Sequence, residues 1–144
     1  MRLKSAVASL LISISTIAVA QQPTKAAVFV EDHTEDNQGH RLAYAVKEQI
    51  RNSAGMRIVD TPGESALQVH LGSIDATGSQ IQTAFTVVYT LTDFGNPGSF
   101  QFYLDSTGGL CGAQAIDQCA NSIVARLDTN LSSVRAAFAA AVKK

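Results

Sequence analysis

Hydrophobic residues change their spacing along this chain, and that change constrains the fold more than any single motif. From Ile81 to Leu91, apolar residues occupy most of the odd positions, and threonine or glutamine occupies most of the even ones. A period of two is typical of a strand with one buried face and one face in water. Leu42, Val46 and Ile50 instead recur every four residues, as they do on the buried face of a helix. The pattern therefore indicates amphipathic helices that cover one face of a sheet.

The same reading along the chain gives five strands and two helices in the order β-α-β-β-β-β-α. Asp36 or Asn37 can cap the start of the first helix, and Gly55 is placed where a helix usually stops. The second helix follows a long repeat of apolar residues at spacings of three and four. The predicted strands are residues 26–32, 56–60, 66–71, 81–91 and 100–105, and the helical segments are residues 34–55 and 116–138.

This order predicts an α/β fold of the α+β kind, a two-layer sandwich with a five-stranded mixed sheet and both helices on one face. The first strand, first helix and second strand would form a right-handed crossover, and the last three strands an antiparallel meander. One short strand is lost if the second and third strands merge. Two sheets packed face to face are the alternative, which the long first helix disfavours. Residues 26–144 would form a single domain.

The first twenty residues have the layout of an export signal. Two basic residues precede an apolar run of about fifteen residues that closes on the sequence AVA at Ala20. A helix needs roughly 20 apolar residues to span a bilayer, so a cleaved signal is favoured over a retained membrane anchor. We therefore expect cleavage between Ala20 and Gln21, a flexible leader at residues 21–25, and a periplasmic or secreted protein without stable membrane insertion after cleavage.

Export bears on the two cysteines, Cys111 and Cys119, because disulfides persist in oxidising compartments. Their spacing of eight matches neither the short C-x₂₋₄-C of zinc sites nor the C-x-x-C of redox centres. An intramolecular disulfide is the favoured interpretation, with an intermolecular bridge or free thiols as alternatives. Bridged Cα atoms lie within about 7 Å, whereas eight residues of helix rise about 12 Å. Cys111 is therefore expected in a glycine-rich loop before the helix that contains Cys119.

The segment EDHTEDNQGH, residues 31–40, gathers carboxylates and histidines where the first strand ends and the first helix begins. Ligands in α/β sheets favour the carboxyl ends of strands, so this segment could bind a divalent cation or perform acid–base chemistry. The alternative is that acidic residues stabilise a helix N-terminus, and the segment lacks the glycine and final glutamate of a calcium loop. The metal hypothesis involves Glu31, Asp32, His33, Asp36 and His40.

Other chemistry is less supported by the sequence. His70 is predicted on the face of its strand opposite Leu67, Val69 and Leu71, as an exposed or edge-packed residue without a role. No serine lies in a G-x-S-x-G motif, and no cofactor motif is present. Removal of the export signal with its two basic residues takes the formal charge from −1 to −3, which gives no electrostatic case for binding nucleic acid.

Several segments resemble small exported bacterial proteins with no assigned role. They are VFVED, GHRLAYAVKEQIRNSAGMRIVD, ALQVHLGSID and CGAQAIDQCA, and together they cover most of the chain after the leader. The order of elements is also similar to the N-terminal α/β domain of the periplasmic protein TolB. These resemblances imply a fold and an envelope location, and no catalytic residue follows from them.

The sequence thus predicts a small exported binding protein without catalytic activity. Its expected partner is another envelope or secreted protein, and it could act as an inhibitor or an assembly partner. The alternative is a divalent-metal binder or metal-dependent hydrolase that uses residues 31–40. A divalent ion that raises the melting temperature would favour the alternative.

Overall fold

The computed structural model describes residues 24–92 and 100–143. The predicted export signal, its expected cleavage site at Ala20 and Gln21, most of the expected leader, and residues 93–99 lie outside the described residues. The elements are β1 (Ala26–Thr34), α1 (Asn37–Asn52), β2 (Met56–Ile58), the 3₁₀ turn η1 (Pro62–Glu64), β3 (Leu67–Ile74), β4 (Gln82–Thr92), β5 (Gln101–Gly112) and α2 (Ile116–Val142).

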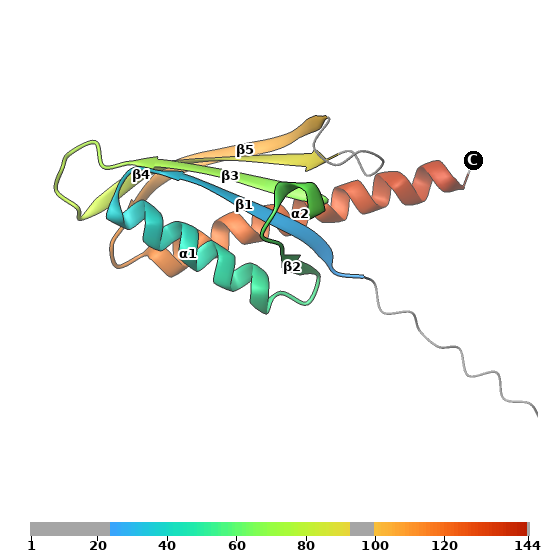
Figure 1. Cartoon of the computed structure of the whole chain (residues 1–144), viewed down its shortest axis with the longest axis horizontal. Coiled ribbons are helices and arrows are strands. Elements are labelled where there is room, and N and C mark those ends of the chain that lie inside the picture. Colours follow the sequence, from blue (N-terminus) through green and yellow to red (C-terminus); the bar gives the residue numbers. More distant parts are fainter. Residues whose placement is uncertain (1–23, 93–99, 144) are drawn as a thin grey trace, which may run out of the picture.

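The five strands form one mixed sheet in the order β2-β1-β3-β4-β5. β1 pairs in parallel with both β2 and β3, whereas β3, β4 and β5 form the predicted antiparallel meander. Figure 1 shows α1 and α2 on the same side of the sheet, which confirms the predicted two-layer architecture. Among the described residues, no helix is both long and apolar enough to cross a membrane.

The face of the sheet turned away from the helices is termed the open face. Along β1, β3 and β4 its residues alternate with those that face the helices, as expected for a sheet covered on one side. The open face carries Phe29, Glu31, His33, Gln68, His70, Gly72, Ile74, Ala84, Thr86, Val88, Thr90, Gln101, Tyr103, Ser106, Gly108 and Leu110.

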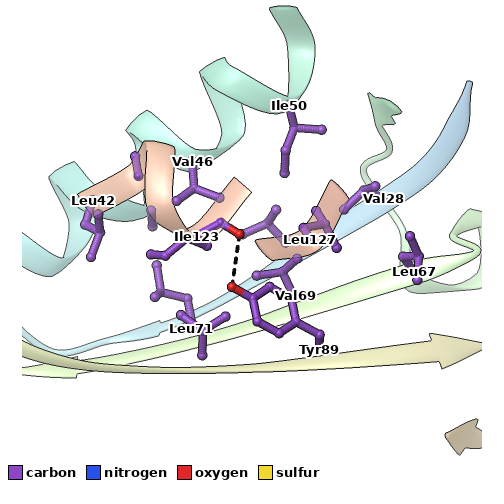
Figure 2. Packing of buried hydrophobic residues seen from close by; sticks show 14 of the residues in the cluster. Val28, Leu42, Val46, Ile50, Leu67, Val69, Leu71, Tyr89, Ile123 and Leu127 are labelled. Carbon is purple, nitrogen blue, oxygen red and sulfur yellow. Dashed lines mark hydrogen bonds between the residues drawn. The ribbon is translucent and has the colours of Figure 1, made fainter. Parts of the chain in front are cut away.

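The core lies between the two helices and the sheet (Figure 2). Tyr89 of β4 is fully buried there, and its hydroxyl donates a hydrogen bond to the carbonyl oxygen of Ile123 in α2 at 3.0 Å. Burial raises the pKa of the Tyr89 hydroxyl, because a phenolate would lose its hydration. Leu127 of α2 and Leu71 of β3 belong to the same buried cluster as Tyr89. The core thus joins α2 to the centre of the sheet.

The helix α1 begins as the sequence indicated and ends slightly earlier. Asp36 is the N-cap, since its side chain accepts a hydrogen bond from the backbone N–H of Gly39 at 2.8 Å. The helix stops at Asn52, because Ser53 has extended backbone angles and donates its N–H to the carbonyl of Ile50. The predicted stop at Gly55 therefore lies just beyond the helix.

Cys111 and Cys119 lie where β5 leads into α2, with their Cα atoms 6.2 Å apart in the geometry of a disulfide. Cys111 belongs to β5, where the sequence indicated a loop. Pairing with β4 extends the strand through the glycines, and Cys111 lies opposite Thr83 on the helix-facing side. Because α2 begins only at Ile116, the two cysteines do not share a helix.

We expect replacement of both cysteines by serine to lower the free energy of unfolding by about 2 kcal/mol. The bond closes a short loop, so it removes only a modest amount of entropy from the unfolded chain. Urea unfolding of the oxidised protein and the double variant measures the difference, and a reductant should leave the variant unaffected. Two thiols that titrate freely in the natively purified protein would contradict the disulfide.

β5 departs from simple alternation at Leu104. Tyr103 and Asp105 lie opposite consecutive residues of β4, so Leu104 is the extra residue of a β-bulge. The apolar alternation of the sequence in this region does not produce a buried face, since the side chains of Phe100 and Phe102 are 66% and 57% exposed. β5 is an edge strand, so these side chains have neighbours on one side only.

Candidate functional site

The acidic segment 31–40 is divided between two faces of the sheet and a helix start. β1 continues to Thr34, two residues beyond the expected end, and consecutive residues of a strand point to opposite faces. The five predicted ligands therefore lie in three places: Glu31 and His33 on the open face, Asp32 with His40 near the start of α1, and Asp36 at the N-cap of α1.

His70 of β3 joins Glu31 and His33 on the open face. In the parallel pairing of β1 and β3, His70 lies directly opposite Glu31. Its Nδ1 is 2.5 Å from Oε2 of Glu31, and Nε2 of His33 is 3.2 Å from the same oxygen. One carboxylate oxygen therefore contacts two imidazole rings. We term Glu31, His33 and His70 the open-face triad.

Hydrogen bonds continue from His70 across the open face to β5. Nε2 of His70 lies 3.2 Å from the hydroxyl of Thr90, and that hydroxyl donates to Oε1 of Gln101 at 3.4 Å. The amide nitrogen of Gln101 donates to Oε1 of Gln68 at 2.9 Å. This network links β3, β4 and β5 and fixes the orientation of the His70 ring.

The electrostatics of the triad favour an ionised glutamate. Partial burial raises the pKa of Glu31, but the hydrogen bonds and charges of His70 and His33 outweigh it, so the pKa lies below its ordinary value. Glu31 is accordingly a carboxylate at neutral pH. The open face thus presents a negative charge flanked by two imidazole rings.

Asp32 and His40 form a second group, on the helix side of the sheet. The backbone N–H and the hydroxyl of Thr34 both donate to Oδ1 of Asp32, at 3.0 and 2.5 Å. Nδ1 of His40 lies 2.7 Å from the Thr34 hydroxyl and 3.4 Å from Oδ2 of Asp32. Burial raises the pKa of Asp32, and these hydrogen bonds lower it further than burial raises it. The contacts stabilise the connection between β1 and α1.

Asp36 joins α1 to two strands. Besides capping the helix, it accepts hydrogen bonds from the hydroxyls of Ser73 at 2.9 Å and Thr83 at 2.7 Å. Burial raises the pKa of Asp36, but the hydrogen bonds from Thr83, Gly39 and Ser73 hold it below the ordinary range. Its described contacts are those of a structural residue at a helix start.

The two edges of the sheet differ in length and protection. β2 has three residues, whereas β5 has twelve and pairs only with β4. Edge strands of natural proteins are usually short or carry lysine, proline or inward-pointing charges that block further pairing. β5 contains no lysine, arginine or proline. Its single charge, Asp105, is bound by Arg126 of α2 through two hydrogen bonds of 2.5 and 3.1 Å.

Exposed apolar side chains border the long edge. Tyr103 and Leu110 project from β5 on the open face, with 66% and 68% of their surface exposed. Leu110 lies opposite Ala84, which in turn lies opposite Ile74, so an apolar row crosses three strands. The sequence showed these residues as apolar but did not indicate which strand would be left at the edge.

No protein-family model matches the chain, and no curated protein matches it. Solved structures resemble it in fold. The hypothetical protein CT253 from Chlamydia trachomatis has a TM-score of 0.55 and 7% identity, covering 76% of this chain and 99% of that chain. Protein XCC0632 from Xanthomonas campestris has a TM-score of 0.51 and 10% identity, covering 81% of this chain and 90% of that chain. At these identities the likeness shows the fold alone, and the similarity to TolB stays a prediction.

Proposed function

We propose that this protein is an exported binding protein that takes up an extended segment of a partner protein as an additional strand along β5. The observation that carries the proposal is the twelve-residue edge strand, paired on one side and bordered by exposed apolar side chains. The proposal assigns no catalytic step to the chain.

The backbone of β5 supports this function. An antiparallel edge directs the N–H and C=O groups of alternate residues away from the sheet, where another strand can bond to them. The stretch after the bulge, residues 105–112, pairs continuously with β4 and is therefore held extended. On the open face there, Ser106 has a small side chain and Gly108 has none, so a partner backbone can approach closely.

The side chains on the open face indicate which residue pattern a partner segment would have. Leu110 and the row through Ala84 and Ile74 offer apolar contacts at one end of the edge, and Tyr103 offers them at the other. Successive residues of an added strand point to opposite faces, so alternate residues of the partner would meet these side chains. The partner segment is therefore expected to be extended, with apolar residues at alternate positions.

Lysine substitutions on the edge test the proposal. Ser106→Lys and Leu110→Lys introduce the residue that natural edge strands use against pairing. Ala125→Lys, at an exposed position of α2, is the matched control. Proteins captured from an envelope extract would be compared among the wild type and these three variants by quantitative mass spectrometry. The partner so identified would then be titrated against each variant.

We expect one partner to be held by the wild type and the control, and its dissociation constant to rise at least about tenfold in both edge variants. A partner that binds the edge variants as tightly as the wild type would contradict the use of β5. The absence of any protein that distinguishes edge variants from the control would also overturn the proposal. Light scattering that shows a dimer of the wild type, dissociated by Leu110→Lys, would assign the edge to a second copy of this chain instead.

A further inference from the structure

We infer that the open-face triad, Glu31, His33 and His70, binds a divalent transition metal, with Zn²⁺ as the ion that suits it best. The inference concerns the middle of the open face and does not depend on the use of the β5 edge. Two of the residues belong to the acidic segment seen in the sequence, and the third comes from a strand that the fold brings beside it.

The backbone places the three ligands without help from a flexible loop. Glu31 and His33 are two residues apart on β1 and share a face, and His70 is the registered neighbour of Glu31 on β3. One candidate ligand atom from each residue lies within 4.8 Å of the other two. All three therefore belong to paired strands, which hold metal ligands more precisely than loops do.

The distances between the ligand atoms are close to those of a metal site. Ligands that bind zinc at 2.0–2.1 Å in a tetrahedral array lie roughly 3.3 Å from one another. Oε2 of Glu31 is 3.2 Å from Nε2 of His33 and 2.5 Å from Nδ1 of His70. Of these two distances only the second has to increase, which a rotation of the partly exposed Glu31 side chain would allow, and the candidate ligand atoms of His33 and His70 lie within 4.8 Å of each other.

A neighbouring hydroxyl orients the ring of His70 for this role. Thr90 donates its proton to Gln101, so its oxygen is available as an acceptor for the N–H at Nε2 of His70. In the metal-free protein the N–H at Nδ1 donates to the Glu31 carboxylate. A metal would replace that proton between Nδ1 and Glu31, while Nε2 donates to Thr90. Histidines that bind metals commonly donate their second ring nitrogen in this way.

The ligand set selects the class of ion. Two imidazoles and one carboxylate suit zinc and related transition metals, whereas Ca²⁺ and Mg²⁺ prefer oxygen ligands throughout. Three protein ligands leave a fourth position for water or a group from another molecule. The side chains of His33 and Glu31 are 60% and 40% exposed, so a ligand in the fourth position can reach the site from solvent.

Calorimetric titration with ZnCl₂ tests the inference directly. The probe is the full processed chain without a histidine tag, first treated with a chelator. We expect one zinc ion per chain, and at least about tenfold weaker binding for His33→Ala, His70→Ala and Glu31→Gln. The chain has three histidines, so His40→Ala removes the only other imidazole and is the matched control, with unchanged affinity. CaCl₂ and MgCl₂ should give no binding.

Proton NMR supplies a second measurement that does not depend on a variant. Zinc should shift the ring resonances of His33 and His70 and leave those of His40 in place. His33 is mostly exposed, so His33→Ala is expected to fold even if His70→Ala does not. No zinc binding by the wild type would overturn the inference. Loss of binding in His40→Ala equal to that in His33→Ala would overturn it as well, since the site would then lie elsewhere.

Discussion

Gly39→Ala is expected to lower the free energy of unfolding by about 3 kcal/mol. Gly39 lies in the first turn of α1, where the helix contacts the sheet. A β-carbon at this position would lie 1.7 Å from Oγ of Ser73, 2.9 Å from its Cβ and 2.8 Å from Cβ of Thr34. The Oγ atom can rotate, but the two β-carbons are fixed to strands. The helix would have to move away from the sheet, and this cost exceeds the roughly 1 kcal/mol by which alanine favours a helix over glycine.

Thermal or urea unfolding measures this effect, and two further variants show whether close packing is its cause. Gly63→Ala is the matched control, because a β-carbon there would meet no atom within 4 Å, and we expect no change beyond about 0.5 kcal/mol. Ser73→Gly in the Gly39→Ala background should restore part of the loss, since it removes the nearest obstruction. Equal stability of Gly39→Ala and the wild type would show that α1 lies farther from β3 than the structure places it.

Asp36→Ala is expected to cost about 2–3 kcal/mol. The substitution removes the N-cap of α1, a loss of about 1 kcal/mol, and leaves the hydroxyls of Ser73 and Thr83 without their acceptor. Both hydroxyl residues are buried, so water replaces the lost contacts poorly. Asp36→Asn should be milder, because asparagine also caps helices and retains one carbonyl oxygen.

The contribution of Asp36 should also depend on pH. Its pKa is lower in the folded protein than in the unfolded chain, so the folded state favours the charged form. The resulting stabilisation is complete above the ordinary aspartate pKa near 4 and is lost as the pH falls through the folded value. Unfolding free energies of the wild type and Asp36→Asn, measured between pH 7 and pH 2, should therefore converge at the acidic end. A constant difference across that range would contradict the lowered pKa.

The fold was largely predictable from the sequence, because the spacing of apolar residues is a local property. Leu42, Val46 and Ile50 are fully buried, as their period indicates. Tyr89 and Val87 likewise show that the odd positions of β4 face the core. What could not be predicted was the pairing of β1 with β3, which depends on how distant segments pack. That pairing brings His70 to Glu31, so the sequence placed His70 on the correct face without revealing its neighbours.

The glycines before Cys111 gave a wrong expectation, because pairing between distant strands also decides the structure here. The run before Cys111 suggested a loop, since isolated glycines weaken strands. In the folded chain these glycines pair with β4. The ring of Phe85 also lies against Gly109, where a β-carbon would be 3.6 Å from two ring atoms. Tertiary pairing therefore outweighs the local preference and extends β5 to Gly112.

The attachment of β5 to α2 has a consequence for the energetics of association. In the stretch after the bulge, residues 105–112, Asp105 at the start binds Arg126, and Cys111 near the end is joined to Cys119. A strand anchored at both ends has already lost most of its backbone freedom, and ordering a residue costs roughly 1–2 kcal/mol of conformational entropy. The conformational entropy lost on binding would then come mainly from the partner segment. Reduction of the disulfide should accordingly weaken binding along β5 mainly through faster dissociation, although Cys111 is buried on the helix-facing side of the sheet.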